Sequence, residues 1–152
     1  MRMSYTRVEW CGQATQVAGL GHFCIHMHHL GHGPDCLFEG CAIEHALEKG
    51  LVLHDVHDAR VHRHVVWDLR GSSVYIEDGN EMNNTLSENV ALCDRRRRTG
   101  GEVGCQIPAG WGPRHAGDDV AFYVIGALQG SSQQPLQRDR MLECRTGESR
   151  PH

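Results

Sequence analysis

Short stretches in which apolar and variable residues alternate recur along residues 20–92, and this alternation predicts β-strands. Three of the stretches match one another: residues 23–26, 51–54 and 74–77. The first aligns with the second at an offset of 28 residues (23 to 51), and the second aligns with the third at 23 (51 to 74). The chain is therefore expected to repeat one strand-containing unit.

A second set of apolar residues repeats in phase with the first, at offsets of 23 and 25 residues. It comprises Phe38, Val61 and Leu86, followed by Ile43, Val66 and Ala91. Repeats of this length, made of short strands joined by turns, are typical of solenoids whose coils bury a shared interior. The pattern predicts an all-β partial solenoid of about four to five coils. Residues 31–35, rich in Gly and Pro, form a loop that lengthens the first repeat.

The predicted stacking places chemically active side chains in one column. His26, His54 and Glu77 each follow an inward apolar residue at the same position of the repeat. Parallel strands lie about 4.7–4.9 Å apart, so these three side chains can converge on one ion or one substrate group. Imidazole and carboxylate together suit zinc, and carboxylates suit calcium. We therefore predict that His26, His54 and Glu77 hold a divalent metal, either calcium or zinc.

Composition limits the choice of function. The chain has 152 residues, which suits one domain, and its net charge of −4 gives no electrostatic reason to expect nucleic acid as a partner. Twelve histidines stand against three each of Trp, Tyr and Phe. Histidine is the commonest metal ligand, although a single histidine can also lie on the surface with no such role. No apolar stretch approaches the length of a membrane span, and the N-terminus lacks a secretory signal.

Seven cysteines show no CxxC pair and no zinc-finger spacing, and their odd number leaves at least one without a partner in the chain. Cys24 is expected to pair with Cys11 or with Cys36 in an oxidising compartment. At the turns, the repeat aligns Cys41, His64 and Asn89. Of these, we expect His64 and Asn89 to be structural and to satisfy backbone groups of the turn.

The repeat fades after Cys93. Residues 120–125 form a credible further strand, and the arginine run at 95–98 suits an exposed loop. Residues 129–152 are mostly polar and are expected to form a disordered tail, which leaves residues 1–128 as the solenoid.

Three ordered motifs carry a resemblance to a known family. They are His22-Phe23-Cys24-Ile25-His26-Met27-His28-His29-Leu30-Gly31, Leu51-Val52-Leu53-His54-Asp55-Val56-His57, and Tyr75-Ile76-Glu77-Asp78-Gly79-Asn80-Glu81-Met82-Asn83-Asn84. Together they resemble the β-helix region of the family that includes cell-migration-inducing hyaluronan-binding protein, the transmembrane cell-surface hyaluronidase and fibrocystin. The match covers roughly residues 8–93. Cys24 stands where the family tends to have proline, and Asp55 stands where it tends to have glycine.

The resemblance implies a right-handed parallel β-helix located outside the cell or at its surface. It also implies binding or cleavage of a hyaluronan-like polysaccharide, whereas fibrocystin-type members look like surface receptors without an enzymatic role. The family's upstream domain and most of its downstream coils are not recognisable here, so the chain is expected to be a fragment of a larger protein. The resemblance does not indicate an oligomeric state.

Three interpretations of the column of residues remain open. Glycoside cleavage needs an acid and a second carboxylate, for which Glu77, Asp78 and His54 are the candidates. His28, His57 and Glu81 would then bind substrate. The alternative is a non-catalytic module that binds glycans or proteins. In the third interpretation Glu77 and Asp78 anchor the turn at Gly79, and the histidines form a stacked surface ladder without a ligand.

Overall fold

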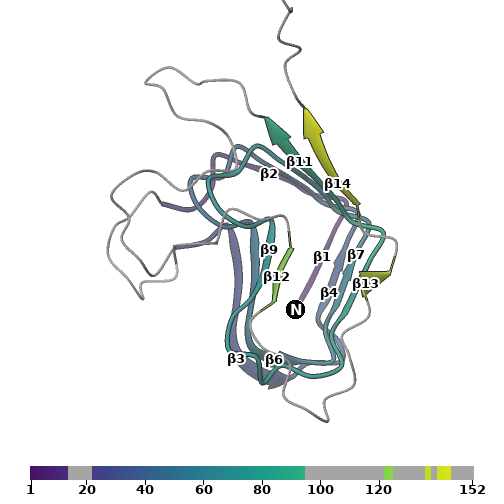
Figure 1. Ribbon diagram of the computed structural model, residues 1–152. Helices are drawn as coiled ribbons and strands as arrows, with labels where there is room; N and C mark the ends of the chain where they lie inside the picture. The colour runs from purple at the N-terminus through teal and green to yellow at the C-terminus, as the bar shows by residue number, and fades with distance from the viewer. Residues whose placement is uncertain (14–21, 95–121, 125–135, 138–139, 145–152) are drawn as a thin grey trace, which may run out of the picture.

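A computed structural model describes residues 1–13, 22–94, 122–124, 136–137 and 140–144 of the chain. The described part contains strands and turns and no helix that could span a membrane. The strands form three parallel sheets that make the three sides of a β-helix (Figure 1). This arrangement confirms the predicted all-β parallel β-helix.

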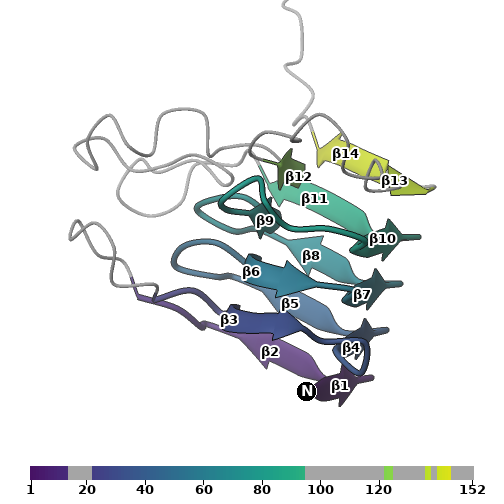
Figure 2. The same cartoon turned by 90° about the horizontal axis from the view of Figure 1, so that it is seen from below.

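The first sheet contains, in spatial order, β1 (Arg2–Ser4), β4 (Leu37–Glu39), β7 (Arg60–His62), β10 (Thr85–Ser87) and β13 (Leu136–Gln137). The second contains β2 (Arg7–Glu9), β5 (Ala42–Glu44), β8 (Val65–Trp67), β11 (Val90–Asp94) and β14 (Arg140–Cys144). The third contains β3 (Ile25–His32), β6 (Leu51–His57), β9 (Val74–Ile76) and β12 (Phe122–Val124). Successive coils stack one above another in Figure 2, so residues one repeat apart become neighbours.

The predicted register of the first two sheets is confirmed. Phe38 pairs with Val61, and Val61 pairs with Leu86. In the second sheet, Val66 pairs with both Ile43 and Ala91. Strands β1 and β2 add a further coil below these, paired with β4 and β5.

The predicted register of the third sheet is wrong by two residues between β3 and β6. Ile25 pairs with Leu51 and His28 pairs with His54, an offset of 26 rather than 28. A shift of two residues keeps every side chain on its own face of the sheet, so the apolar pattern fits both registers equally well. Cys24, joined to Cys11 by a disulfide, lies just before β3 and donates its N–H to the Lys49 carbonyl. The offset of 23 between β6 and β9 is confirmed.

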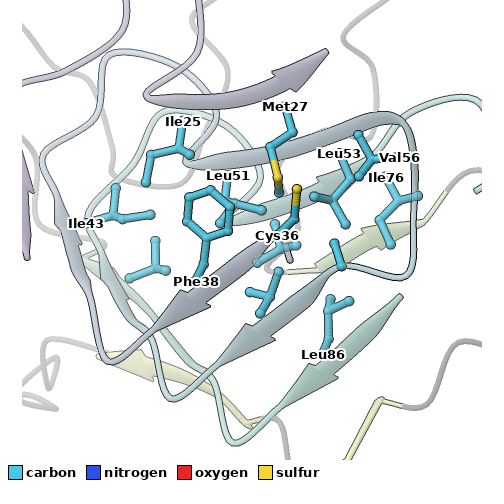
Figure 3. Packing of buried hydrophobic residues seen from close by; sticks show 14 of the residues in the cluster. Ile25, Met27, Cys36, Phe38, Ile43, Leu51, Leu53, Val56, Ile76 and Leu86 are labelled. Carbon is cyan, nitrogen blue, oxygen red and sulfur yellow. The ribbon is translucent and has the colours of Figure 1, made fainter. Parts of the chain in front are cut away.

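The interior is a single apolar column lined by all three sheets (Figure 3). Its largest fully buried apolar side chains are Phe38, Met27, Ile43, Leu51, Leu53, Leu69, Ile76 and Leu86. Each such side chain contributes roughly 1.5–3 kcal/mol relative to its exposed state. Two buried thiols, Cys36 and Cys41, also lie here and are free. The disulfide, in contrast, lies at the edge of this core and is the pairing with Cys11 that the sequence left open.

Polar side chains inside the turns bond to the backbone of the coil below. Asn89 accepts a hydrogen bond from the His64 N–H and donates one to the Val61 carbonyl. Asn84 does the same for the Ala59 N–H and the Val56 carbonyl. The predicted structural role of Asn89 is confirmed. His64 is buried beneath it, and this burial lowers the pKa of its imidazole.

The chain after Asp94 differs from expectation. β12 confirms the strand predicted within residues 120–125. The range 129–152, predicted as a disordered tail, contains β13 and β14, which extend the first two sheets in parallel. The apolar residues Leu136, Met141 and Leu142 recur in an otherwise polar segment, and overall polarity concealed this short strand pattern. The arginine run at 95–98 lies outside the described residues.

Candidate functional site

The outward face of the third sheet carries a cluster of imidazoles and carboxylates. On β3, Ile25 and Met27 point inward and are buried, so the alternating His26 and His28 point outward. His54 on β6 follows the buried Leu53 in the same way. Glu77 and Asp78 come directly after β9. We call these five residues the histidine wall.

The corrected register changes which residues share a column. His28 lies opposite His54, and Glu77 follows the Leu53–Ile76 pair in the next coil. His26 stands one side chain further back along β3, opposite Val52. The predicted trio of His26, His54 and Glu77 is therefore not a single vertical column. The shift nevertheless keeps all three on one face and adds His28 to them.

The three imidazoles lie against one another. The ring centroids of His28 and His54 are 4.5 Å apart, and those of His26 and His28 are 4.8 Å apart. Nδ1 of His28 lies 3.3 Å from Nε2 of His26. One ring nitrogen from each of the three residues lies within 4.8 Å of the others. Such convergence suits coordination of one ion by several nitrogens.

Two carboxylates approach the same imidazole. His54 Nε2 lies 2.9 Å from Asp78 Oδ2, and His54 Nδ1 lies 3.4 Å from Glu77 Oε2. Glu77 Oε2 is buried and makes no hydrogen bond within the described part of the chain. The three residues predicted as catalytic are thus brought together, with a carboxylate at each nitrogen of the His54 ring.

Glu81 is not brought to the wall. Its side chain is buried, and its carboxylate accepts hydrogen bonds from the N–H groups of Asp55, Asp78 and Gly79. Glu81, rather than Glu77 or Asp78, therefore anchors this turn. Glu81 was predicted to contact substrate; the structure places it inside the turn, with its oxygens bonded to backbone donors.

His57 is also tied to the turn. Its Nδ1 accepts a hydrogen bond from the Met82 N–H, and only 12% of its side chain is exposed. Of the three residues predicted to bind substrate, the structure places His28 alone on the histidine wall.

Sequence reasoning missed two further pairs beside the wall. Nδ1 of His29 lies 3.1 Å from Asp55 Oδ2, and Nδ1 of His32 lies 2.8 Å from Asp58 Oδ2. The hydrogen bond with each histidine lowers the pKa of its aspartate. Both pairs have a separation of 26 residues, close to the observed register of β3 on β6, which is 26 up to His28 and 25 at His32.

A buried cation, Lys49, lies beside the wall. The Lys49 ammonium lies 5.0 Å from the centre of the Phe23 ring and 4.6 Å from that of Tyr75, and it pairs with Glu48 at 3.6 Å. Phe23 in turn packs edge-on against His26, with ring centroids 5.0 Å apart. These contacts restrict the position of His26 relative to the sheet.

Comparison with known proteins decides the family. A family model described as CEMIP beta-helix matches residues 1–107, which is more than half of the chain. The chain belongs to the CEMIP beta-helix family. The family resemblance inferred from the three motifs is thereby confirmed. The histidine wall lies within the matched residues.

Relatives of this CEMIP beta-helix chain are large proteins. Human Fibrocystin-L is 37% identical over 95 residues, which cover 60% of this chain and 2% of that protein. Mouse Fibrocystin-L is 35% identical over a region of the same length. A G8 domain-containing protein of Dictyostelium discoideum is 31% identical over 71 residues, covering 47% of this chain and 6% of its own length. No solved structure matches the chain significantly.

The relatives define the class of the module. CEMIP and fibrocystin relatives are extracellular or cell-surface proteins, so this chain is an extracellular type of β-helix module. The Cys11–Cys24 disulfide agrees with an oxidising environment.

Proposed function

We propose that this module binds an acidic, hyaluronan-like polysaccharide along the histidine wall. The observation that carries the proposal is a group of imidazoles on the outward side of two adjacent coils. His26 and His28 on β3 and His54 on β6 belong to the wall, and the exposed His29 and His32 lie beside it. Imidazoles donate to and accept from sugar hydroxyls when neutral, and they attract carboxylates when protonated. The family resemblance supports hyaluronan as the polysaccharide class.

Exposure of the imidazoles favours a ligand that lies across the surface. The side chains of His29 and His32 are 55% and 70% exposed, and His28 is exposed beside them. When His29 and His32 are protonated, they form ion pairs with Asp55 and Asp58 and offset part of the repulsion between these carboxylates and an acidic chain.

Binding of hyaluronan oligosaccharides to the immobilised chain tests the proposal. We expect the double variant His28→Ala, His29→Ala to lose at least about tenfold in affinity, because two adjacent polar contacts are removed. The matched control is His62→Ala, whose imidazole bonds to Ser87 on a different sheet. Equal affinity of the parent and the double variant would contradict the proposal.

Hydrolysis is a second candidate, favoured by the placement of Glu77 and Asp78 on either nitrogen of His54. A glycosidase needs two carboxyl groups with separate roles. Size analysis of hyaluronan after incubation distinguishes the candidates. Shortening by the parent chain that disappears in Glu77→Gln supports hydrolysis, whereas intact polymer with retained binding supports a binding module.

A further inference from the structure

We propose that His26, His28 and His54 form a binding site for one divalent transition-metal ion, with zinc as the reference case. The site replaces the predicted trio of His26, His54 and Glu77, since His28 enters and Glu77 moves to an outer position. It lies within the histidine wall and deepens the proposed function, but metal binding can be measured without any polysaccharide.

The nitrogen positions fit a tetrahedral ion. Zinc–nitrogen bonds of about 2.0–2.1 Å with tetrahedral angles place two ligand nitrogens about 3.3–3.4 Å apart. Nδ1 of His28 and Nε2 of His26 are 3.3 Å apart. In the metal-free chain this contact is a hydrogen bond between the two rings, and its length equals the edge that an ion bound to both nitrogens would require.

The backbone explains why the three rings converge. His26 and His28 are two residues apart on one strand and therefore share its outward face. His54 lies directly opposite His28 on the neighbouring strand. All three ligand nitrogens are within 4.8 Å of one another, so small ring rotations bring His54 to the same ion.

The carboxylates provide the outer support that metal-bound histidines need. A ligating imidazole usually donates its second N–H to a carboxylate or carbonyl. His54 has Glu77 at one nitrogen and Asp78 at the other. With the Nε2 of His54 facing the ion, its Nδ1 donates to Glu77 in the outer shell, and Asp78 lies on the side of the ion. This arrangement also gives a role to the buried Glu77 Oε2, which lacks a hydrogen bond among the described residues.

The donor set selects the metal. Imidazole nitrogens suit zinc, copper and nickel, whereas calcium takes six to eight oxygen ligands. Three nitrogens and two nearby carboxylates match the first group. Of the two metals considered from the sequence, zinc is therefore favoured over calcium.

Four other histidines of the described chain already have a hydrogen-bond partner at one ring nitrogen. Of these, His29 also packs against His28 and His54, with ring centroids 4.2 Å and 4.4 Å apart. His29, His32 and His45 pair with Asp55, Asp58 and Asp68, each from the next coil. His57 accepts from the Met82 backbone, so its Nδ1 is occupied.

Titration of the metal-free chain with zinc chloride, read by competition with a chromogenic chelator, tests the proposal. We expect each chain to bind one zinc ion tightly, and excess calcium chloride should not displace this ion. His28→Ala should weaken zinc binding by at least about tenfold, and Glu77→Gln by about 10–100-fold as an outer-shell change. His32→Ala, an exposed histidine on the same strand, should bind zinc like the parent. Circular dichroism of each variant verifies that the fold is retained.

If no zinc ion binds tightly, the proposed metal site is wrong. So would equal weakening in His28→Ala and His32→Ala, because this would show unspecific binding to surface histidines. If His28→Ala does not fold, Glu77→Gln decides the question, since it keeps all three ligands. Zinc binding without hyaluronan binding would refute only the proposed function, and hyaluronan binding without zinc would refute only this site.

Discussion

Two polar columns of the same solenoid differ in how their groups are satisfied. The inner column, Asn89 and His64, lies buried at one turn, and the Asn89 amide bonds to backbone groups of the neighbouring coil. The histidine wall lies outside, where side chains face other side chains. Stacking produced both columns, but only the outer one leaves ring nitrogens directed at a common point. The inner column stabilises coils, and the outer column is suited to bind a ligand.

The largest expected effect is a fall in the free energy of unfolding when the inner column is disrupted. Asn89→Ala leaves the His64 N–H and the Val61 carbonyl buried without their partner. Each unsatisfied buried group costs about 1–3 kcal/mol, so the free energy of unfolding should fall by about 2–5 kcal/mol. Urea unfolding measures this, with the exposed Asn80→Ala as the control. A loss equal to that of the control would show that the inner column is not structural.

His54→Ala tests the histidine wall, where we expect a large effect on ligand binding and a small effect on stability. Its partners are partly exposed, so the loss in free energy of unfolding should stay within about 1 kcal/mol. Zinc and hyaluronan binding should nevertheless fall strongly. Urea unfolding and the two binding assays on the same preparation check this. A destabilisation as large as that of Asn89→Ala would assign His54 to the scaffold instead.

Acidification distinguishes a buried imidazole from exposed ones. Burial lowers the pKa of His64 below its ordinary value of 6.5. The unfolded chain therefore takes up a proton first, and the stability linked to His64 is lost as pH falls from about 6.5 toward its folded pKa. His64→Asn should remove this part of the pH dependence. Thermal unfolding between pH 7.5 and 5 tests it, and an unchanged slope in the variant would contradict it.

The smallest expected effect concerns the exposed pair beside the wall. The hydrogen bond with His32 lowers the pKa of Asp58 below its ordinary value of 3.8. The stability linked to Asp58 is therefore complete above that value and is lost as pH falls through the folded pKa. His32→Ala should remove this small stabilisation at pH values above about 4, and the dependence of the melting temperature on pH below about 4 should become flatter. If the melting temperatures of the parent and the variant depend on pH in the same way, the His32–Asp58 pair does not contribute to stability.

The family motifs and the apolar pattern were sufficient to predict the solenoid. Phe38, Val61 and Leu86 must all face inward because they recur at the repeat length in strands of period two. The same reasoning placed His54 and Glu77 on one outward face. It could not choose between offsets of 26 and 28 for β3, because both preserve the alternation.

Sequence alone determined the coil architecture, the inward apolar residues and the outward face that carries His26, His54 and Glu77. Tertiary structure decided which of these groups meet. The register of β3 brought His28 opposite His54, and the turn drew Glu81 inside while leaving Asp78 against the His54 ring. The physical reason is that side-chain alternation fixes a face, whereas hydrogen bonds between coils and the conformations of the turns fix position along it.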